Sequence, residues 1–169
     1  MRAPAVEATS GVMQPTPETD AFWRSFRDAH PDAPAEYRIL QFGGGDLPLA
    51  DELAALVADG PKRATTTLLR DFETGREPVF PVSGMLWLVV DAAVRPRAVI
   101  RTTRVDTCAF DDVDAAFARD EGEGDGSLAW WRDAHLRYFG RQAAEDGFVF
   151  DGRTPVVLER FALVWTPPR

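Results

Sequence analysis

A switch from helix to strand in the first half of the chain limits the possible folds more than any other feature. Residues 53–57 place leucine and valine at the spacing of one helix face. Gly60 and Pro61 then end the helix, because glycine favours the C-terminal cap and proline cannot continue the backbone pattern. Residues 64–69 are short and rich in β-branched threonine, which is typical of a strand. Lys62 is therefore predicted just after a helix end, with threonine hydroxyls close behind it.

The remaining elements show no βαβ alternation. Apolar and β-branched runs predict further strands at residues 37–42, 85–90, 97–105 and 154–165. Helical spacing predicts helices capped by Thr19 or Asp20, by Asp51, by Asp111 or Asp112, and by Ser127, the last helix ending at Gly140. Residues 70–81 look like a long loop. The pattern favours an α+β fold, a small β-barrel of five or six mostly antiparallel strands with three or four helices packed around it.

We expect one hydrophobic core and one domain. The core is expected to contain Leu53, Leu56, Val57, Leu86, Leu88, Val99 and Phe117. Residues 1–18 are rich in proline, threonine and alanine and lack periodicity, so they are predicted to be a flexible tail before a domain at 19–169. No apolar run approaches the ~20 residues of a membrane span, and the first residues do not resemble a secretory signal. A cytoplasmic location is the expectation.

Metal and cofactor motifs are scarce. Cys108 is the single cysteine and the chain has two histidines, which argues against a zinc or iron centre. The triple glycine at residues 43–45 is not part of a GxGxxG or GxxxxGK[ST] motif, so a phosphate-binding loop is not expected there. We therefore predict no metal and no cofactor.

The charge of the chain restricts its partners. A net charge of −8 and a pI near 4.8 oppose tight binding to duplex DNA, whose affinity comes largely from lysine and arginine on phosphates. A small ligand or a short single strand fits better. Arg101 and Arg104 lie in a basic strip at residues 95–104, and strand alternation predicts that they point to opposite faces.

Two motifs carry a family resemblance. Residues 60–65, Gly-Pro-Lys-Arg-Ala-Thr, fit the pattern GxKxxT, and residues 117–135 are similar to the segment FAxxEGEGDxSLxxWRxxH of the larger bacterial ASCH proteins. Together, and in this order, they indicate that the chain resembles the ASCH family, which adopts a PUA-like barrel. Gly84 is followed by Met85 where the family commonly has aspartate, so any role of that aspartate is lost here.

The resemblance implies a catalytic trio. In the ASCH proteins that act as amidohydrolases, a threonine is the nucleophile beside a lysine and a glutamate, and the matching positions are Thr65, Lys62 and Glu121. A threonine hydroxyl needs a neighbour to remove its proton, and a lysine partly removed from water can help. Glu121 could orient the lysine or protonate a leaving amine. The alternative is a solvated lysine, an ordinary strand threonine and a surface carboxylate.

Further candidates for ligand binding are weaker. They are Arg63, Thr67, Arg101, Arg104, Ser127, Trp131 and His135. Ser127 is first of all a predicted helix cap and only second a catalytic hydroxyl. His135 shares an apolar stripe with Trp131, which favours a core histidine bonded to backbone over a general base. Glu121 and Glu123 resemble a glycosidase pair only in composition, because a glycine-rich loop gives them no defined separation.

Two classes of function remain open. One is a hydrolase that acts on the N4-acyl amide of a modified cytidine or, alternatively, a ribonuclease. The other is a non-catalytic module that binds RNA or a nucleotide in the same cleft, with Lys62 supplying charge. The acidity of the chain favours a nucleoside-sized ligand over long RNA. The sequence leaves the oligomeric state open.

Overall fold

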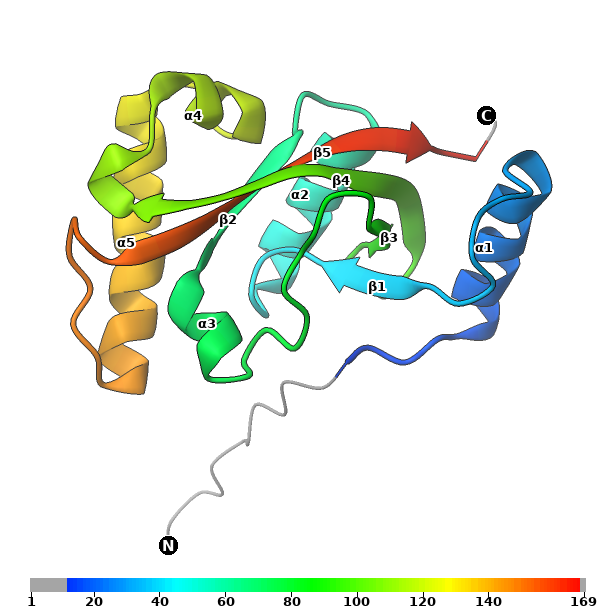
Figure 1. The fold of residues 1–169 in the computed structure, drawn as a ribbon, viewed down its shortest axis with the longest axis horizontal. Coiled ribbons are helices and arrows are strands. Elements are labelled where there is room, and N and C mark those ends of the chain that lie inside the picture. The colour runs from blue at the N-terminus through cyan, green and yellow to red at the C-terminus, as the bar shows by residue number, and fades with distance from the viewer. Residues whose placement is uncertain (1–11, 168–169) are drawn as a thin grey trace, which may run out of the picture.

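The computed structural model describes residues 12–167 and contains one curled, mixed sheet that forms a half-barrel (Figure 1). The strands are β1 (Arg38–Gln41), β2 (Ala64–Leu68), β3 (Leu86–Val90), β4 (Pro96–Ala109) and β5 (Pro155–Trp165), in the spatial order β1-β3-β4-β5-β2. β1 pairs with β3 in parallel, and the other three pairs are antiparallel. The predicted α+β class with a mostly antiparallel, barrel-like sheet is confirmed.

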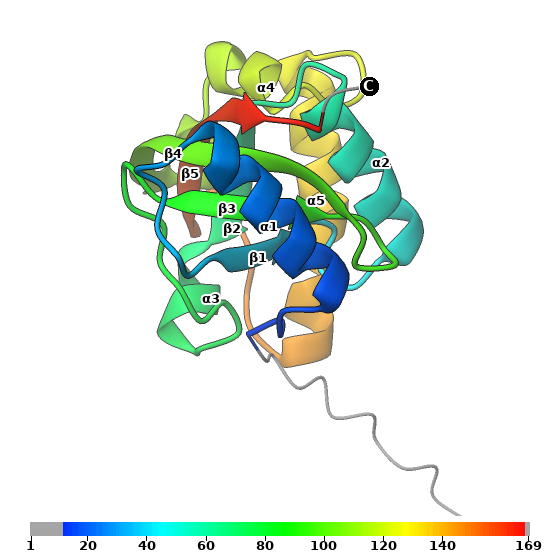
Figure 2. The same ribbon diagram turned by 90° about the vertical axis from the view of Figure 1, so that its right-hand side faces the viewer.

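Five α-helices lie in the described part of the chain, where the sequence indicated three or four. They are α1 (Pro17–Ala29), α2 (Leu47–Ala58), α3 (Leu69–Glu73), α4 (Ala115–Glu121) and α5 (Leu128–Asp146), with a 3-10 turn η1 at Phe110–Asp112. Figure 2 shows α1 in front of the sheet and α2 at its right-hand side, while Figure 1 shows α5 at the end of the molecule opposite α1. α3 lies within the predicted loop 70–81.

The buried side chains form three clusters, so the prediction of one core is wrong. The cluster with α1 contains Leu88 and Val99, with Leu86 packed against it; the cluster with α2 contains Leu53 and Val57, with Leu56 packed against it; Phe117 lies in the third. The pleat of the sheet explains the division, because successive side chains of one strand point to opposite faces. β3 illustrates this, since Trp87 joins the α2 cluster and Leu88 the α1 cluster.

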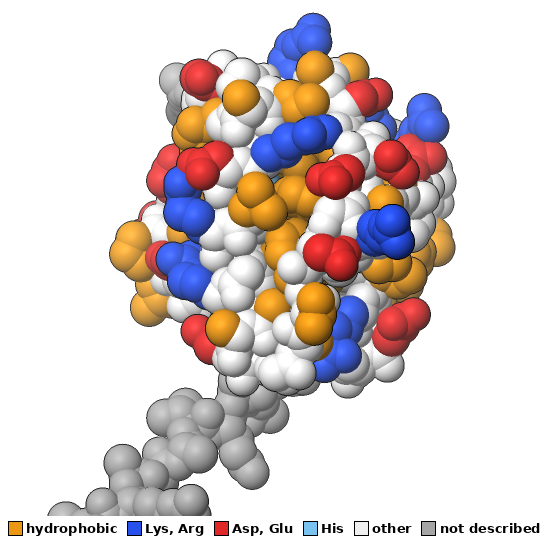
Figure 3. Space-filling model, turned by 90° about the vertical axis from the view of Figure 1, so that its left-hand side faces the viewer, with side chains coloured by type: hydrophobic (Ala, Val, Ile, Leu, Met, Phe, Trp, Pro, Cys, Tyr) orange, Lys and Arg blue, Asp and Glu red, His pale blue; other side chains and the backbone are white. Residues whose placement is uncertain are grey.

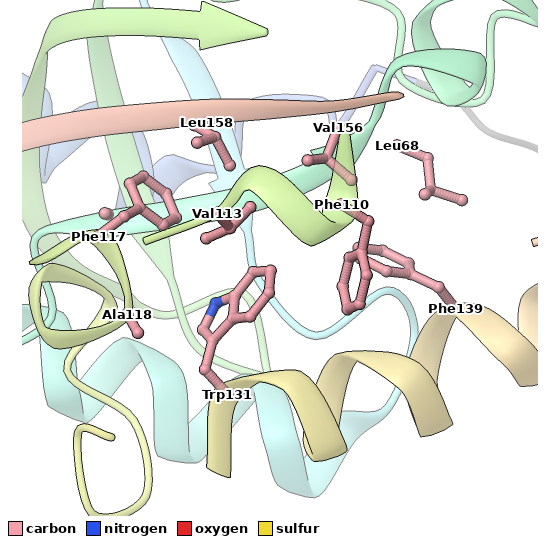
Figure 4. Packing of buried hydrophobic residues seen from close by; sticks show 10 residues of the cluster. Leu68, Phe110, Val113, Phe117, Ala118, Trp131, Phe139, Val156 and Leu158 are labelled. Atoms are coloured by element: carbon pink, nitrogen blue, oxygen red, sulfur yellow. The ribbon is translucent and has the colours of Figure 1, made fainter. Parts of the chain in front are cut away.

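The third cluster joins α4 and α5 to the far end of the sheet (Figure 4). Trp131 and Phe139 extend from α5 toward Phe110 and Val156. The Trp131 and Phe110 rings stack with centroids 5.1 Å apart. This packing fixes the position of α5 beside β2.

Two predicted helix starts are wrong. α1 begins at Pro17, inside the predicted tail, and Thr16 forms its capping box instead of Thr19 or Asp20; residues 1–11 of that tail lie outside the described residues. α2 is capped by Asp46, whose side chain accepts from the Leu49 N–H at 3.0 Å. Asp51 instead accepts from Ala92 N at 2.9 Å.

The ends of the later helices also differ from the prediction. Asp114, and neither Asp111 nor Asp112, caps α4. Ser127 caps α5 as predicted, but the helix continues through Gly140 to Asp146. Burial of Gln142 and Ala143 beyond the glycine outweighs the ~1 kcal/mol that a glycine costs inside a helix.

Of the helices formed by residues 12–167, none has the length and apolar character needed to cross a membrane.

Candidate functional site

Lys62 is a buried cation at the junction between α2 and β2. Its backbone N–H donates to the Leu56 carbonyl at 3.2 Å, and its side chain is fully buried. Nζ donates to the Ala64 carbonyl at 2.9 Å and to the carboxylate of Glu123, and it lies 4.0 Å from Oε1 of Glu121. The alternative of a solvated lysine is therefore wrong.

Glycines bring the two glutamates to Lys62. Gly122 ends α4 in the left-handed conformation with φ of 66°, and a Cβ there would stand 2.7 Å from the carbonyl carbon of Pro61. A side chain at Gly124 would similarly overlap the ring of Trp130, with a nearest distance of 2.1 Å. The Glu-Gly-Glu-Gly run therefore has a physical basis, because only glycine lets this loop lie against the backbone before β2.

Glu121 is held by donors from α5. It is 1% exposed, accepts from the indole N–H of Trp131, and lies 3.4 Å from Nε2 of His135. Nδ1 of His135 is 2.8 Å from the Trp131 carbonyl, which can only accept, so Nδ1 carries a proton. Nε2 of His135 faces the carboxylate, so a protonated ring gains an ion pair with Glu121.

Opposing influences act on the pKa values of this pair. Burial by itself would raise the pKa of Glu121, but His135, Lys62 and Trp131 together hold it below the ordinary value. Burial would lower the pKa of His135, but the charge and hydrogen bond of Glu121 raise it. The cluster therefore holds Lys62 and His135 against Glu121 and Glu123, and the charged forms of Glu121 and His135 stabilise each other.

A cavity of about 260 Å³ opens beside this cluster. Its lining residues come from the segment before α2, from α2 and β2, from the end of α4 and the loop after it, and from α5. Its walls include Phe42, Thr65, Glu121, Glu123, His135 and Tyr138. The structure thus brings Thr65 and Glu121 to one cavity, and Lys62 lies behind it through its contacts with the two glutamates.

A second cavity of about 440 Å³ lies on the other side of Thr65. The two cavities share Phe42, Gly43, Thr65, Thr66 and Tyr138 as lining residues. Thr67, a predicted binding residue, lines the larger cavity only. Thr65 therefore stands at the point where the two spaces meet.

The larger cavity contains a buried carboxyl group that the sequence reasoning missed. Glu159 lies directly opposite Thr65 in the antiparallel register of β2 and β5 and is 7% exposed. Its Oε1 accepts from the Thr102 hydroxyl at 2.5 Å, and Thr102 accepts from the Trp87 indole at 3.1 Å. Burial raises the pKa of Glu159, against the smaller effect of these neutral donors. The sequence does carry a signal for this residue, because Glu159 is a single carboxylate within the apolar run of β5.

The other predicted residues have structural contacts. Arg63 donates to the Val57 carbonyl at 3.1 Å and so caps α2, and Ser127 caps α5. Trp131 is buried and stacks on His135, with ring centroids 4.2 Å apart. None of these three lines either cavity.

The two arginines of β4 lie outside both cavities. Arg101 is exposed, and Arg104 pairs with Asp106 at 2.7 Å. The prediction that they point to opposite faces is wrong. A bulge between Thr102 and Arg104 shifts the alternation by one residue and leaves both on one face.

The residues after Gly84 keep a tight turn although the family's aspartate is absent. Gly84 N donates to the Thr102 carbonyl at 2.8 Å, and Met85 N donates to the Val82 carbonyl at 3.1 Å. The Met85 side chain packs against the α2 cluster.

In residues 12–167 no three histidine, cysteine or acidic side chains are arranged to hold a metal ion.

Charge on the α5 side of the molecule is mixed. Figure 3 shows acidic and basic side chains interleaved around a band of hydrophobic ones, without a broad basic field on that face. The surface near α5 thus lacks the uniform positive charge that follows a long nucleic-acid backbone.

Comparison with known proteins places these features in a family. The family model of the ASCH domain matches residues 38–165. A crystal structure of a protein from Enterococcus faecalis, assigned to a family of unknown function, has a TM-score of 0.75 and 29% identity, covering 87% of this chain and 88% of that one. A crystal structure of an ASCH domain from Lactobacillus crispatus also has a TM-score of 0.75 and 29% identity, covering 90% and 98%. No curated protein matches the chain.

Proposed function

This chain belongs to the ASCH domain family, and on that premise we propose that it binds a modified pyrimidine nucleoside, free or within RNA, and hydrolyses an N4-acyl amide of cytidine. The ASCH domain has a PUA-like fold that is thought to bind RNA. The observation that supports the proposal is a shared cavity: Thr65, Glu121, Glu123 and His135 line it, with Lys62 buried behind the glutamates. A hydroxyl group, two carboxyl groups, a lysine and a histidine are thus close to one ligand-sized space.

In the proposed reaction, Thr65 attacks the acyl carbon. The Thr65 oxygen forms a bond to the carbonyl carbon, the C–N bond breaks, and the exocyclic amine of the base leaves with a proton. Water then hydrolyses the acyl ester on Thr65 and releases the carboxylic acid.

The structure changes which group is best suited to take the threonine proton. Lys62 lines neither cavity, whereas Glu121 and Glu123 line the smaller cavity together with Thr65. The side chain of Glu123 is 16% exposed and that of Glu121 is 2% exposed. We therefore assign proton transfer to Glu123, and to Glu121 the positioning of Lys62 and His135.

Size and charge support a nucleoside-sized ligand. The smaller cavity, about 260 Å³, lies just below the ~300–1,000 Å³ that is usual for ligand pockets, and the larger one, about 440 Å³, lies within it. Phe42 and Tyr138 offer aromatic surface in both cavities. A net charge of −8 disfavours a long phosphate backbone.

Binding without catalysis is the second candidate, and one observation favours it. Lys62 already donates to groups of the protein itself, so its charge could serve only to stabilise the fold of the cavity wall. In that case Thr65 supplies one hydrogen bond to a ligand and no bond is broken.

The test combines a substrate panel with substitutions of Thr65. Incubation with N4-acylated cytidines and short RNAs, followed by mass spectrometry, identifies the product and also detects ribonuclease activity. For the substrate found, Thr65→Val should lower kcat by at least about 10³-fold with binding retained, while Thr65→Ser keeps part of the activity. Thr107→Val, an exposed position on β4 outside both cavities, is the matched control.

The outcomes separate the two candidates. If Thr65 only binds the ligand, Thr65→Val should weaken the binding free energy by about 0.5–1.5 kcal/mol, the value of one neutral hydrogen bond. Lys62→Met should damage both versions and does not discriminate. Near-normal hydrolysis by Thr65→Val would show that Thr65 is not the nucleophile.

A further inference from the structure

Glu159 combines deep burial with the absence of a cationic partner. Its side chain faces the larger cavity, and within residues 12–167 no lysine, arginine or histidine lies within ion-pair distance of it. Its neighbours Thr102 and Trp87 are neutral donors. Burial without a counter-charge favours the uncharged acid, and the raised pKa agrees with this.

A hydrogen-bond chain runs behind Glu159 from Trp87 through Thr102. An indole N–H can only donate, so the Trp87 ring gives its proton to the Thr102 oxygen, and the Thr102 hydroxyl gives its own to Oε1 of Glu159. With Oε1 as the acceptor from Thr102, a neutral Glu159 carries its proton on Oε2. The acid thus presents a donor and an acceptor side by side in a known order.

This order matches one type of base edge. Cytosine has an acceptor, N3, beside a donor, the exocyclic N4–H, so the acid can donate from Oε2 to N3 and accept at Oε1 from N4–H. Uracil in the same pose would place N3–H against the acid proton and O4 against Oε1. Both contacts are then unfavourable, and the chain from Trp87 opposes the reversal of the acid.

We propose that the larger cavity is a cytosine subsite in which Glu159 reads the N3 and N4–H edge of the base. The inference rests on the proposed function and extends it to recognition of the substrate. Thr65 and Glu159 are direct cross-strand partners, whose Cβ atoms lie about 4.5–5.5 Å apart in such pairs. A base paired with Glu159 therefore carries its N4 substituent toward Thr65, and the acyl group extends into the smaller cavity.

Binding of cytidine and uridine to the wild-type protein and two variants tests the inference. Isothermal titration calorimetry should show cytidine binding at least about tenfold tighter than uridine, which corresponds to about 1.4 kcal/mol. Glu159→Gln should keep this preference, because its carbonyl accepts from Thr102 and its amide donates to N3. Glu159→Leu should abolish it. Glu145→Gln, an exposed position near the end of α5 and outside both cavities, is the control.

Several results would overturn the inference. They are equal binding of the two nucleosides by the wild-type protein, absence of cytidine binding, an unchanged preference in Glu159→Leu, or equal losses in the glutamine and leucine variants. If Glu159→Leu does not fold, NMR of isotopically labelled cytidine decides with the wild-type protein alone. The N3 resonance should shift on binding, as expected for a nitrogen that accepts a hydrogen bond, and an unshifted resonance contradicts the pairing.

Failure of the subsite and failure of the hydrolase can be distinguished. A Glu159-dependent preference for cytidine with no hydrolysis of any N4-acylcytidine refutes the chemistry at Thr65 and leaves the subsite intact. Hydrolysis that requires Thr65 but is indifferent to Glu159→Leu refutes the subsite alone.

Discussion

Glu121 and Glu159 are buried to a similar degree on the two sides of Thr65, yet their surroundings are opposite. Glu121 is 1% exposed and contacts His135 and Lys62, while Glu159 is 7% exposed and contacts only neutral donors. The pKa of Glu121 is lowered against the effect of burial, and that of Glu159 is raised by burial. The difference teaches that burial alone does not set the charge of a carboxyl group; its partners do.

The partners differ because the two glutamates are positioned by different kinds of structure. Glu121 stands at the end of α4, where a glycine loop and α5 bring charged side chains from separate segments. Glu159 stands within β5, where register alone sets its neighbours, Thr65 on one side and the β4 strand on the other. Here the converging elements supply charged partners to Glu121, while the neighbouring strands supply neutral donors to Glu159.

Matched Glu→Gln substitutions should give the largest difference in stability. Glu121→Gln removes one partner of a buried ion network and leaves His135 and Lys62 undercompensated, so it should cost about 3–5 kcal/mol in the free energy of unfolding. Glu159→Gln keeps an acceptor for Thr102 and removes an unpaired acid, so it should change stability by less than about 1 kcal/mol. Urea unfolding at neutral pH measures both. Similar losses in the two variants would break the comparison.

A glycine pair tests whether loop geometry creates the charged side of the site. Gly122→Ala combines a left-handed φ of 66° with a Cβ 2.7 Å from the Pro61 carbonyl carbon. It should cost about 1–3 kcal/mol from backbone conformation and overlap together. Gly126→Ala has a φ of 74° but no atom within 4 Å of the new Cβ, so only the backbone cost remains. Equal thermal shifts for the two variants would show that the close approach at Gly122 is unimportant.

The pH dependence of stability should have opposite signs for the two glutamates. The pKa of Glu159 is raised above the ordinary 4.5, so its contribution is complete below that pH and is lost as pH rises through the folded-state pKa. The pKa of Glu121 is lowered below 4.5, so its contribution is present above that pH and is lost as pH falls through the folded-state pKa. Each unit of difference from the unfolded chain corresponds to about 1.4 kcal/mol.

Difference curves isolate these effects from other groups. Asp71 and Glu77 also have raised pKa values from burial, so wild-type stability alone mixes several groups. Subtracting the curve of each Glu→Gln variant from that of the wild type should give a falling difference above pH 4.5 for Glu159 and a rising one in the acid range for Glu121. Two curves with the same slope would contradict the assignment of charge states.

The smallest effect is expected for a charge pair outside both cavities. Arg104 pairs with Asp106 on the surface, and its side chain is 67% exposed. Arg104→Ala should change the unfolding free energy by less than about 1 kcal/mol, because solvent screens such pairs. Ligand affinity should not change, and a clear loss of affinity would return Arg104 to the list of binding residues.

The sequence predicted the parts of the fold that repeat a simple period. All five strands and the apolar faces of α1, α2 and α5 follow from alternation or helical spacing. Periodicity does not reveal α3, because five residues are too few to show a helical period. Local sequence predicts a helix end at Gly140, because it does not show the packing that lets α5 continue.

The candidate site was predictable only in part for a similar reason. Lys62, Thr65 and Glu121 were found through short motifs, but the contact of Glu123 with Lys62 depends on the path of a glycine loop. Glu159 could not be paired with Thr65 without the register of two strands distant in sequence. The direction of Arg104 depended on a bulge, which the alternation of side chains does not reveal.

The strand order has a consequence for folding kinetics. β3 and β4 are neighbours in sequence and in space, so they can pair early, whereas β2 pairs with β5 alone among the described strands and must wait until that distant segment arrives. Until then β2 has no neighbour on either side, and such a strand is prone to aggregate. Thr65 and Glu159 meet only in this late step. The appearance of ligand binding during refolding should therefore coincide with the pairing of β2 and β5, the paired strands that lie farthest apart in sequence.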